Sequence, residues 1–224
     1  ACPWAHRTTI FRELKGLQDM IGLSVTHWLM ADDGWTFRPA PGVVPDPLND
    51  AETMWQVYVA SDPGYTGRAT VPVLWDRHDG RIVSNESADI IRMFNSAFDE
   101  VGAAEGDYYP EPLRDNIDAV NERVYDGLNK GVYKAGFARS QEAYDEAVAV
   151  VFETLDWLEA HLSTHACLCG ETLTEADWRL FTTLLRFDPV YHGHFKCNLR
   201  RLIDYPALRA YARRLYSYNA VAPT

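Results

Sequence analysis

Residues 69–84, read ATVPVLWDRHDGRIVS, decide the fold of the first part of the chain. Branched and aromatic side chains favour extended backbone, so we predict a strand over residues 69–76 that begins through Pro72. The pair Asp79-Gly80 is typical of a tight turn between two strands. We therefore expect residues 81–84 to return as the second strand of a hairpin.

The elements on either side of this hairpin can be predicted from the spacing of apolar residues. We expect a helix over 7–17, a strand over 22–30, an irregular Pro- and Gly-rich loop over 31–50, a short helix over 53–60 and, after the hairpin, a helix over 85–94 capped by Ser84 or Asn85. This order is that of an α/β thioredoxin-like unit without its first strand. We expect that strand to lie just upstream of Ala1.

The second half of the chain has a different pattern. Residues 99–112 are acidic and contain Gly and Pro, which indicates a linker between domains 1–98 and 113–224. Helical spacing then recurs over 113–128, 140–162, 174–185 and 206–216. Thr174 with Asp177 three residues later is typical of a capping box. We predict an all-α second domain.

Composition narrows the class of function. The 224 residues carry 21 Lys and Arg against 32 Asp and Glu, a net charge of −11. This acidity disfavours nucleic acids and anionic membranes as partners. There is no apolar run of about 18 residues, which a membrane span needs, and we expect no signal peptide. We expect a cytoplasmic protein, and the start without Met and the end at Thr224 suggest part of a longer one.

Four cysteines suit a reducing compartment, and Cys2 stands in a motif that favours chemistry. In Cys2-Pro3-Trp4-Ala5 the thiol precedes a helix, whose unpaired N–H groups and dipole stabilise a thiolate. Ala5 stands where a second cysteine would close a disulfide, so an external thiol such as glutathione must resolve any mixed disulfide. The alternative is a buried structural cysteine in a turn.

Two further elements fit a peptide-like ligand. A proline at the start of a strand is often cis, and in thioredoxin-like folds it faces the reactive thiol, which would leave the Val71 backbone free to pair with a ligand. At the predicted helix start, Ser87 and backbone N–H groups could bind a carboxylate, and Glu86 could bind an ammonium group. The alternatives are an ordinary edge-strand proline and an ordinary helix cap.

Taken together, these motifs resemble the glutathionyl-hydroquinone reductases, the Xi class of the glutathione transferase superfamily. The resemblance covers nearly the whole chain and rests on 2–8 (CPWAHRT), 71–76 (VPVLWD), 82–87 (IVSNES), 131–138 (GVYKAGFA), 173–181 (LTEADWRLF), 186–191 (RFDPVY) and 193–198 (GHFKCN). It implies the glutathione transferase fold, with glutathione as co-substrate and no metal.

The resemblance also implies a set of site residues. Cys2 would attack the sulfur of a glutathionyl-hydroquinone, Tyr133 would transfer a proton, and Tyr191 would hydrogen-bond the thiolate. The implied glutathione site is Trp35, Arg68, Val71, Glu86 and Ser87. The family has another tyrosine in a C-terminal segment, which we expect beyond Thr224. Family members usually dimerise, so we expect a homodimer. From the sequence alone, Trp35 and both tyrosines are equally compatible with core packing.

Three other functions remain open at this point. Histidines and cysteines gather between His161 and Cys197, which could indicate zinc, although their spacing matches no common zinc motif. The same fold also carries conjugating transferases, dehydroascorbate reductases and thioltransferases. A glutathione-binding module without catalysis is the third alternative.

Overall fold

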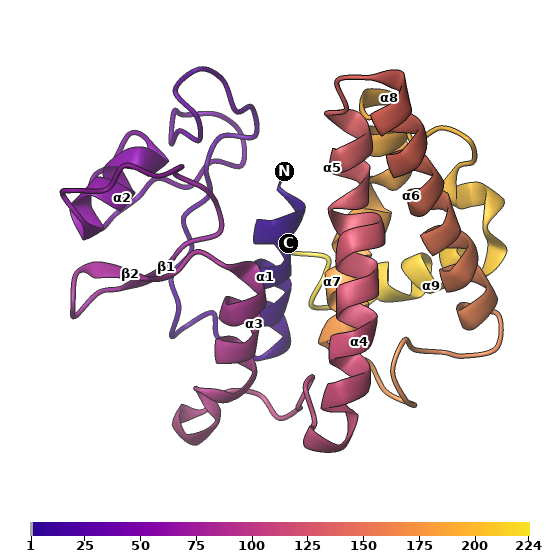
Figure 1. Ribbon diagram of the computed structural model, residues 1–224. Helices are drawn as coiled ribbons and strands as arrows, with labels where there is room; N and C mark the ends of the chain where they lie inside the picture. The colour runs from indigo at the N-terminus through magenta and orange to yellow at the C-terminus, as the bar shows by residue number, and fades with distance from the viewer. Residues whose placement is uncertain (1) are drawn as a thin grey trace. The chain divides into compact units, whose positions relative to one another are not determined.

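The computed structural model describes residues 2–224 (Figure 1). The chain divides into two compact units, residues 1–105 and 106–224, and this division falls inside the predicted linker. Among residues 2–224 there is no helix long and apolar enough to cross a bilayer.

The first unit contains three helices and one hairpin within its described residues. They are α1 (Pro3–Leu14), α2 (Met54–Ser61), β1 (Leu74–Asp76), β2 (Arg81–Ser84) and α3 (Ser87–Ser96), followed by a 3₁₀ turn at Asp99–Val101. Strands β1 and β2 pair antiparallel, with Trp75 opposite Ile82. Gly80 in the turn has φ +65°, a left-handed conformation that favours glycine. The predicted hairpin is therefore confirmed.

Two apolar cores hold this unit together. Helices α1 and α3 pack side by side through buried Ile10 and Phe11 on α1 and Ile90 and Ile91 on α3. The second core surrounds α2 and takes in Val71, Val73, Trp75 and Ile82 from the hairpin region. Helix α2 begins at Met54, one residue after the predicted start, with Thr53 as its N-cap.

The strand predicted over 22–30 is wrong. A strand needs a backbone partner along its length. Among the described residues, this segment makes such bonds only at Val25, which pairs with Val44, and at His27, whose N–H donates to Thr36 O. Its apolar side chains other than Val25 are exposed, and Trp28 is 59% exposed. The apolar residues of this segment therefore form no buried face of a sheet.

Three predicted boundaries also need correction. The first strand of the hairpin is only Leu74–Asp76, because Pro72 has no N–H and the backbone of Thr70 bonds to the Tyr58 hydroxyl instead of a strand. The N-cap of α3 is Glu86, not Ser84 or Asn85, because β2 runs through Ser84. The first helix begins at Pro3 and ends at Leu14, earlier than predicted at both ends.

The second unit is helical. Its elements are a 3₁₀ turn (Glu111–Leu113), α4 (Arg114–Val124), the π-helical turn η3 (Tyr125–Asn129), α5 (Gly131–Gly136), α6 (Gln141–Leu162), α7 (Glu175–Arg186), the π-helical turn η4 (Phe187–Tyr191), α8 (His192–His194), a 3₁₀ turn (Leu202–Asp204) and α9 (Pro206–Tyr216). The Thr174–Asp177 capping box is present. The buried Asp177 carboxylate also accepts bonds from Leu168 N and the Tyr211 hydroxyl, so it links three segments.

Candidate active site

Cys2 is the N-cap residue of α1, and Pro3 occupies the first helical position. The Cys2 carbonyl accepts the His6 N–H at 3.1 Å, which is the first hydrogen bond of the helix. The thiol is partly exposed and in free form. The first N–H groups of a helix have no partners within it, and the thiol lies at this end of α1, although its sulfur makes no capping hydrogen bond.

Val71 lies beside this thiol. The Cys2 Sγ approaches the Val71 carbonyl oxygen at 3.9 Å, although 69 residues separate them in the sequence. The Val71–Pro72 peptide bond is cis. The first unit thus brings together two of the predicted site residues.

Glu86 and Ser87 form the start of α3. The Glu86 carboxylate accepts the Ala88 N–H at 3.2 Å, and the buried Ser87 hydroxyl lies 3.3 Å from the same Glu86 oxygen. Helix packing between α1 and α3 places this pair in the same compact unit as Cys2.

Arg7 contacts Ser87 from within the core of the first unit. It was not identified as a site residue from the sequence. Its side chain is 1% exposed, its Nη1 donates to Ser87 Oγ at 3.4 Å, and its guanidinium lies 4.5 Å from the Trp4 ring centre. A signal was available, because Arg7 falls one turn before Ile10 and Phe11 on the buried face of the same helix.

The other two predicted glutathione-site residues, Trp35 and Arg68, differ in burial. Trp35 is partly buried and packs against the core around α2, which leaves part of its surface exposed. Arg68 is exposed, and its carbonyl oxygen accepts the Tyr65 hydroxyl at 2.8 Å. Its guanidinium has no ion-pair partner within residues 2–224, which leaves it able to meet an anionic ligand.

Tyr133 and Tyr191 lie close together in the second unit. Tyr133 is on α5, Tyr191 is the last residue of η4, and their ring centres are 6.0 Å apart. Tyr191 is 2% exposed, whereas Tyr133 is partly exposed. Because π-helical turns often occur at functional sites, the position of Tyr191 on η4 is consistent with a role in chemistry.

The other three cysteines differ from Cys2 in access. Burial raises the pKa of the Cys169 and Cys197 thiols to about 12, and burial followed by the nearby Asp177 raises that of Cys167. The thiolate is the reactive form, so these three should be inert at neutral pH.

We therefore expect iodoacetamide at pH 7.5 to label Cys2 in the folded protein and to leave Cys167, Cys169 and Cys197 unlabelled. Peptide mass spectrometry after a short exposure measures this. Labelling of all four cysteines in guanidinium chloride serves as the control. Equal labelling of Cys197 and Cys2 in the native protein would contradict the assignment.

The zinc alternative gains no support from the geometry. Within residues 2–224, there is no group of three or more His, Cys, Asp or Glu side chains placed to hold a metal ion. The His161 and His165 rings stack with centres 4.4 Å apart, and His161 Nε2 lies 3.2 Å from the Cys167 carbonyl oxygen. These contacts are those of a packed helix end.

Comparisons with known proteins agree with this geometry. Residues 1–97 match the glutathione S-transferase N-terminal domain, and residues 141–214 match the glutathione S-transferase C-terminal domain. The chain is 58% identical to glutathionyl-hydroquinone reductase PcpF of Sphingobium chlorophenolicum, over all of this chain and 72% of that protein. The chain belongs to the glutathionyl-hydroquinone reductases.

Solved structures of this reductase family have the same fold. The glutathione-bound structure of YqjG from Escherichia coli K-12 has a TM-score of 0.98 at 57% identity, over all of this chain and 73% of that one. The Xi glutathione transferase of Phanerochaete chrysosporium has a TM-score of 0.95 at 52% identity, over all of this chain and 78% of that one. The thioredoxin-like unit followed by a helical unit is thus the glutathione transferase fold, as predicted.

Proposed function

We propose that this chain reduces glutathionyl-hydroquinones to hydroquinones with glutathione as reductant. The observation that carries the proposal is Cys2 at the start of α1 beside the Val71 carbonyl, in a chain that belongs to the glutathionyl-hydroquinone reductases. A thiol in this position is suited to attack sulfur.

In the first step, the Cys2 thiolate attacks the glutathionyl sulfur of the substrate. A Cys2–glutathione disulfide forms, the bond between sulfur and the ring carbon breaks, and its electron pair stays on the ring. That carbon takes a proton, which we assign to the Tyr133 hydroxyl, and the hydroquinone leaves. Tyr191 is assigned to stabilise the thiolate by a hydrogen bond.

In the second step, the thiolate of another glutathione attacks the mixed disulfide. Glutathione disulfide leaves and the Cys2 thiolate is restored. The sum of both steps converts one conjugate and one glutathione into one hydroquinone and one glutathione disulfide. The cycle uses thiol and phenol groups and needs no metal.

The glutathione part of the substrate would lie along residues of the first unit. The Val71 backbone would pair with the peptide, in the manner of an added strand. Ser87 with the N–H groups at the start of α3 would bind the γ-glutamyl carboxylate, and Glu86 its ammonium. Arg68 would meet the glycyl carboxylate and Trp35 would pack on the tripeptide. We further propose a homodimer that acts in the cytoplasm.

The test is glutathione-dependent reduction of a glutathionyl-menadiol conjugate by the purified chain. We expect turnover at about 1–10³ s⁻¹ with one glutathione disulfide formed per hydroquinone. Dehydroascorbate and a chlorodinitrobenzene conjugation assay are run beside it. Turnover of dehydroascorbate alone would instead favour the other cysteine-type activities, and binding of glutathione without any turnover would favour a non-catalytic module.

A further inference from the structure

The two predicted catalytic tyrosines belong to an aromatic cluster formed by Tyr133, Phe137, Tyr191 and Phe195. Phe195 is its centre, with ring centres 5.2 Å from Tyr133, 5.4 Å from Tyr191 and 5.3 Å from Phe137. It stacks on Tyr191 and meets Tyr133 edge-on. Such paired rings favour one mutual orientation, and Phe195 contacts both tyrosine rings.

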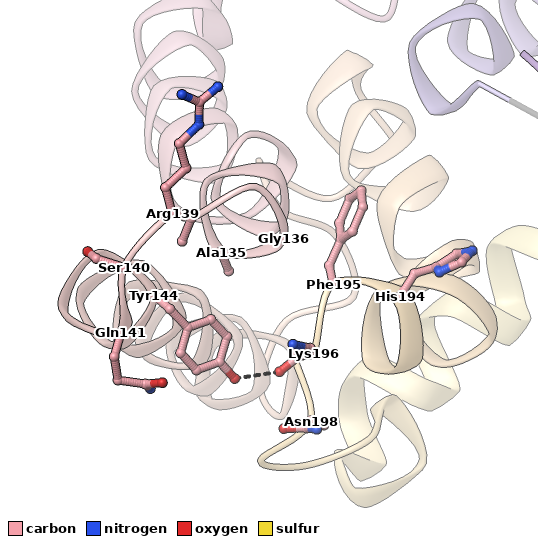
Figure 2. Close-up of a pocket in the computed structure, with 11 residues that line it drawn as sticks. Ala135, Gly136, Arg139, Ser140, Gln141, Tyr144, His194, Phe195, Lys196 and Asn198 are labelled. Atoms are coloured by element: carbon pink, nitrogen blue, oxygen red, sulfur yellow. Dashed lines mark hydrogen bonds between the residues drawn. The ribbon is translucent and has the colours of Figure 1, made fainter. Parts of the chain in front are cut away.

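Phe195 can occupy this place because residue 136 has no side chain. A Cβ on Gly136 would lie 2.7 Å from the Phe195 Cβ and nearer still to the ring carbons Cγ and Cδ1. Figure 2 shows the Phe195 ring rising beside the end of α5, where Gly136 lies. The φ angle of Gly136 is not in the left-handed region, so close approach is what requires glycine here.

Hydrogen bonds fix the backbone of residues 195–197. The Tyr191 carbonyl accepts the N–H groups of Phe195 at 3.2 Å and of Cys197 at 3.1 Å. The Tyr144 hydroxyl donates to the Lys196 carbonyl at 2.6 Å, the dashed line in Figure 2. The ring, not the backbone, is therefore the part that can move.

Space for such movement exists next to the cluster. Gly136 and Phe195 line a pocket of about 360 Å³ together with Tyr144 and Lys196 (Figure 2). An added methyl group at residue 136 would push the Phe195 ring, which borders this pocket. The fold can then survive while the tyrosine rings lose their support.

We propose that Phe195 is a positioning residue, held against the bare Cα of Gly136, which fixes the Tyr133 hydroxyl for proton transfer. The inference rests on the proposed function, since it gives Phe195 a role through Tyr133. It also makes a separate claim about where the rings lie, which can be tested without activity.

The test is Gly136→Ala in the full chain, with Gly193→Ala as matched control. Gly193 lies in the same region, and a Cβ there would meet no atom within 4 Å. We expect kcat for the glutathionyl-menadiol conjugate to fall about 10²-fold in Gly136→Ala with little change in KM, because a small misplacement of a reacting group has this effect. Gly193→Ala should match the wild type. Wild-type kcat in Gly136→Ala would overturn the proposal.

A double-mutant cycle separates positioning from general damage. In a Tyr133→Phe background there is no Tyr133 hydroxyl left to misplace, so Gly136→Ala should cause a further loss of well under 10²-fold, which would arise from the Tyr191 ring that Phe195 also contacts. The same additional 10²-fold loss in that background would overturn the proposal. Phe195→Leu, which keeps Gly136 and cannot clash with it, should reproduce both results if Gly136→Ala does not fold.

Resonances of isotope-labelled tyrosine report ring positions independently of turnover. We expect the Tyr133 and Tyr191 signals to shift in Gly136→Ala and to stay unchanged in Gly193→Ala. Unchanged signals in Gly136→Ala would overturn the positioning claim. Full activity of Tyr133→Phe would instead refute the proton donor of the proposed function, a result distinct from the ring positions.

Discussion

Replacing Cys2 by alanine should lower kcat for the glutathionyl-menadiol conjugate at least about 10³-fold, the scale of loss when a nucleophile is removed. No other thiol can take its place, because Cys167, Cys169 and Cys197 are buried and burial raises the pKa of each thiol. Steady-state release of hydroquinone measures the effect.

The control for this change is Cys167→Ala, which also removes one thiol and should keep wild-type turnover. Glutathione should still bind to Cys2→Ala, because the Glu86–Ser87 pair and the Val71 backbone remain. Calorimetric titration with glutathione tests this. Comparable turnover by Cys2→Ala and the wild type would refute the covalent mechanism.

Replacing Tyr133 by phenylalanine should lower kcat by about 10²–10⁴-fold, the usual contribution of a general acid. The ring stays in the aromatic cluster and only the hydroxyl is lost, so stability should change little. Tyr216→Phe is the matched control, because Tyr216 is 59% exposed and lies outside the cluster. Its turnover should equal that of the wild type.

The two steps of the cycle sharpen this prediction. Release of glutathione from a preformed Cys2–glutathione disulfide requires no proton at a ring carbon. Tyr133→Phe should therefore complete this second step at nearly the wild-type rate in a stopped-flow experiment. An equal slowing of both steps would mean that Tyr133 acts on the thiol and not on the ring.

Much of the fold could be predicted because local signals and tertiary packing agree. Asp79-Gly80 marks the hairpin turn, and helix α9 spans Pro206–Tyr216 as the apolar spacing predicts. The capping box at Thr174 likewise needs only two side chains three residues apart.

Other features depend on contacts that no local pattern contains. Residues 22–30 alternate like a strand, yet a strand also needs a partner, and this segment finds one at only two residues. The π-helical turn η3 interrupts the end of the helix predicted over 113–128, and η4 lies outside the predicted helices. Phe195 and Gly136 are far apart in the sequence, so the close approach between them becomes visible only in the structure.

Some residues of the candidate site could likewise be predicted from local sequence, and others could not. Helix-start chemistry predicted Cys2, and the structure places it beside Val71. Arg7 was missed because a charged residue within a helix is usually exposed. Here its side chain is buried and hydrogen-bonds the Ser87 hydroxyl. The assignments of Tyr133 and Tyr191 came from the family resemblance, because seven tryptophans and twelve tyrosines offer many equivalent aromatic candidates.

Peptide mass spectrometry of the chain after a single turnover tests the central claim most directly. The wild type is mixed with excess glutathionyl-menadiol conjugate in the absence of free glutathione, quenched in acid and digested. We predict one glutathione on the peptide that contains Cys2, one hydroquinone released per chain, and loss of the adduct when glutathione is added. Hydroquinone release without an adduct on Cys2 would contradict the account.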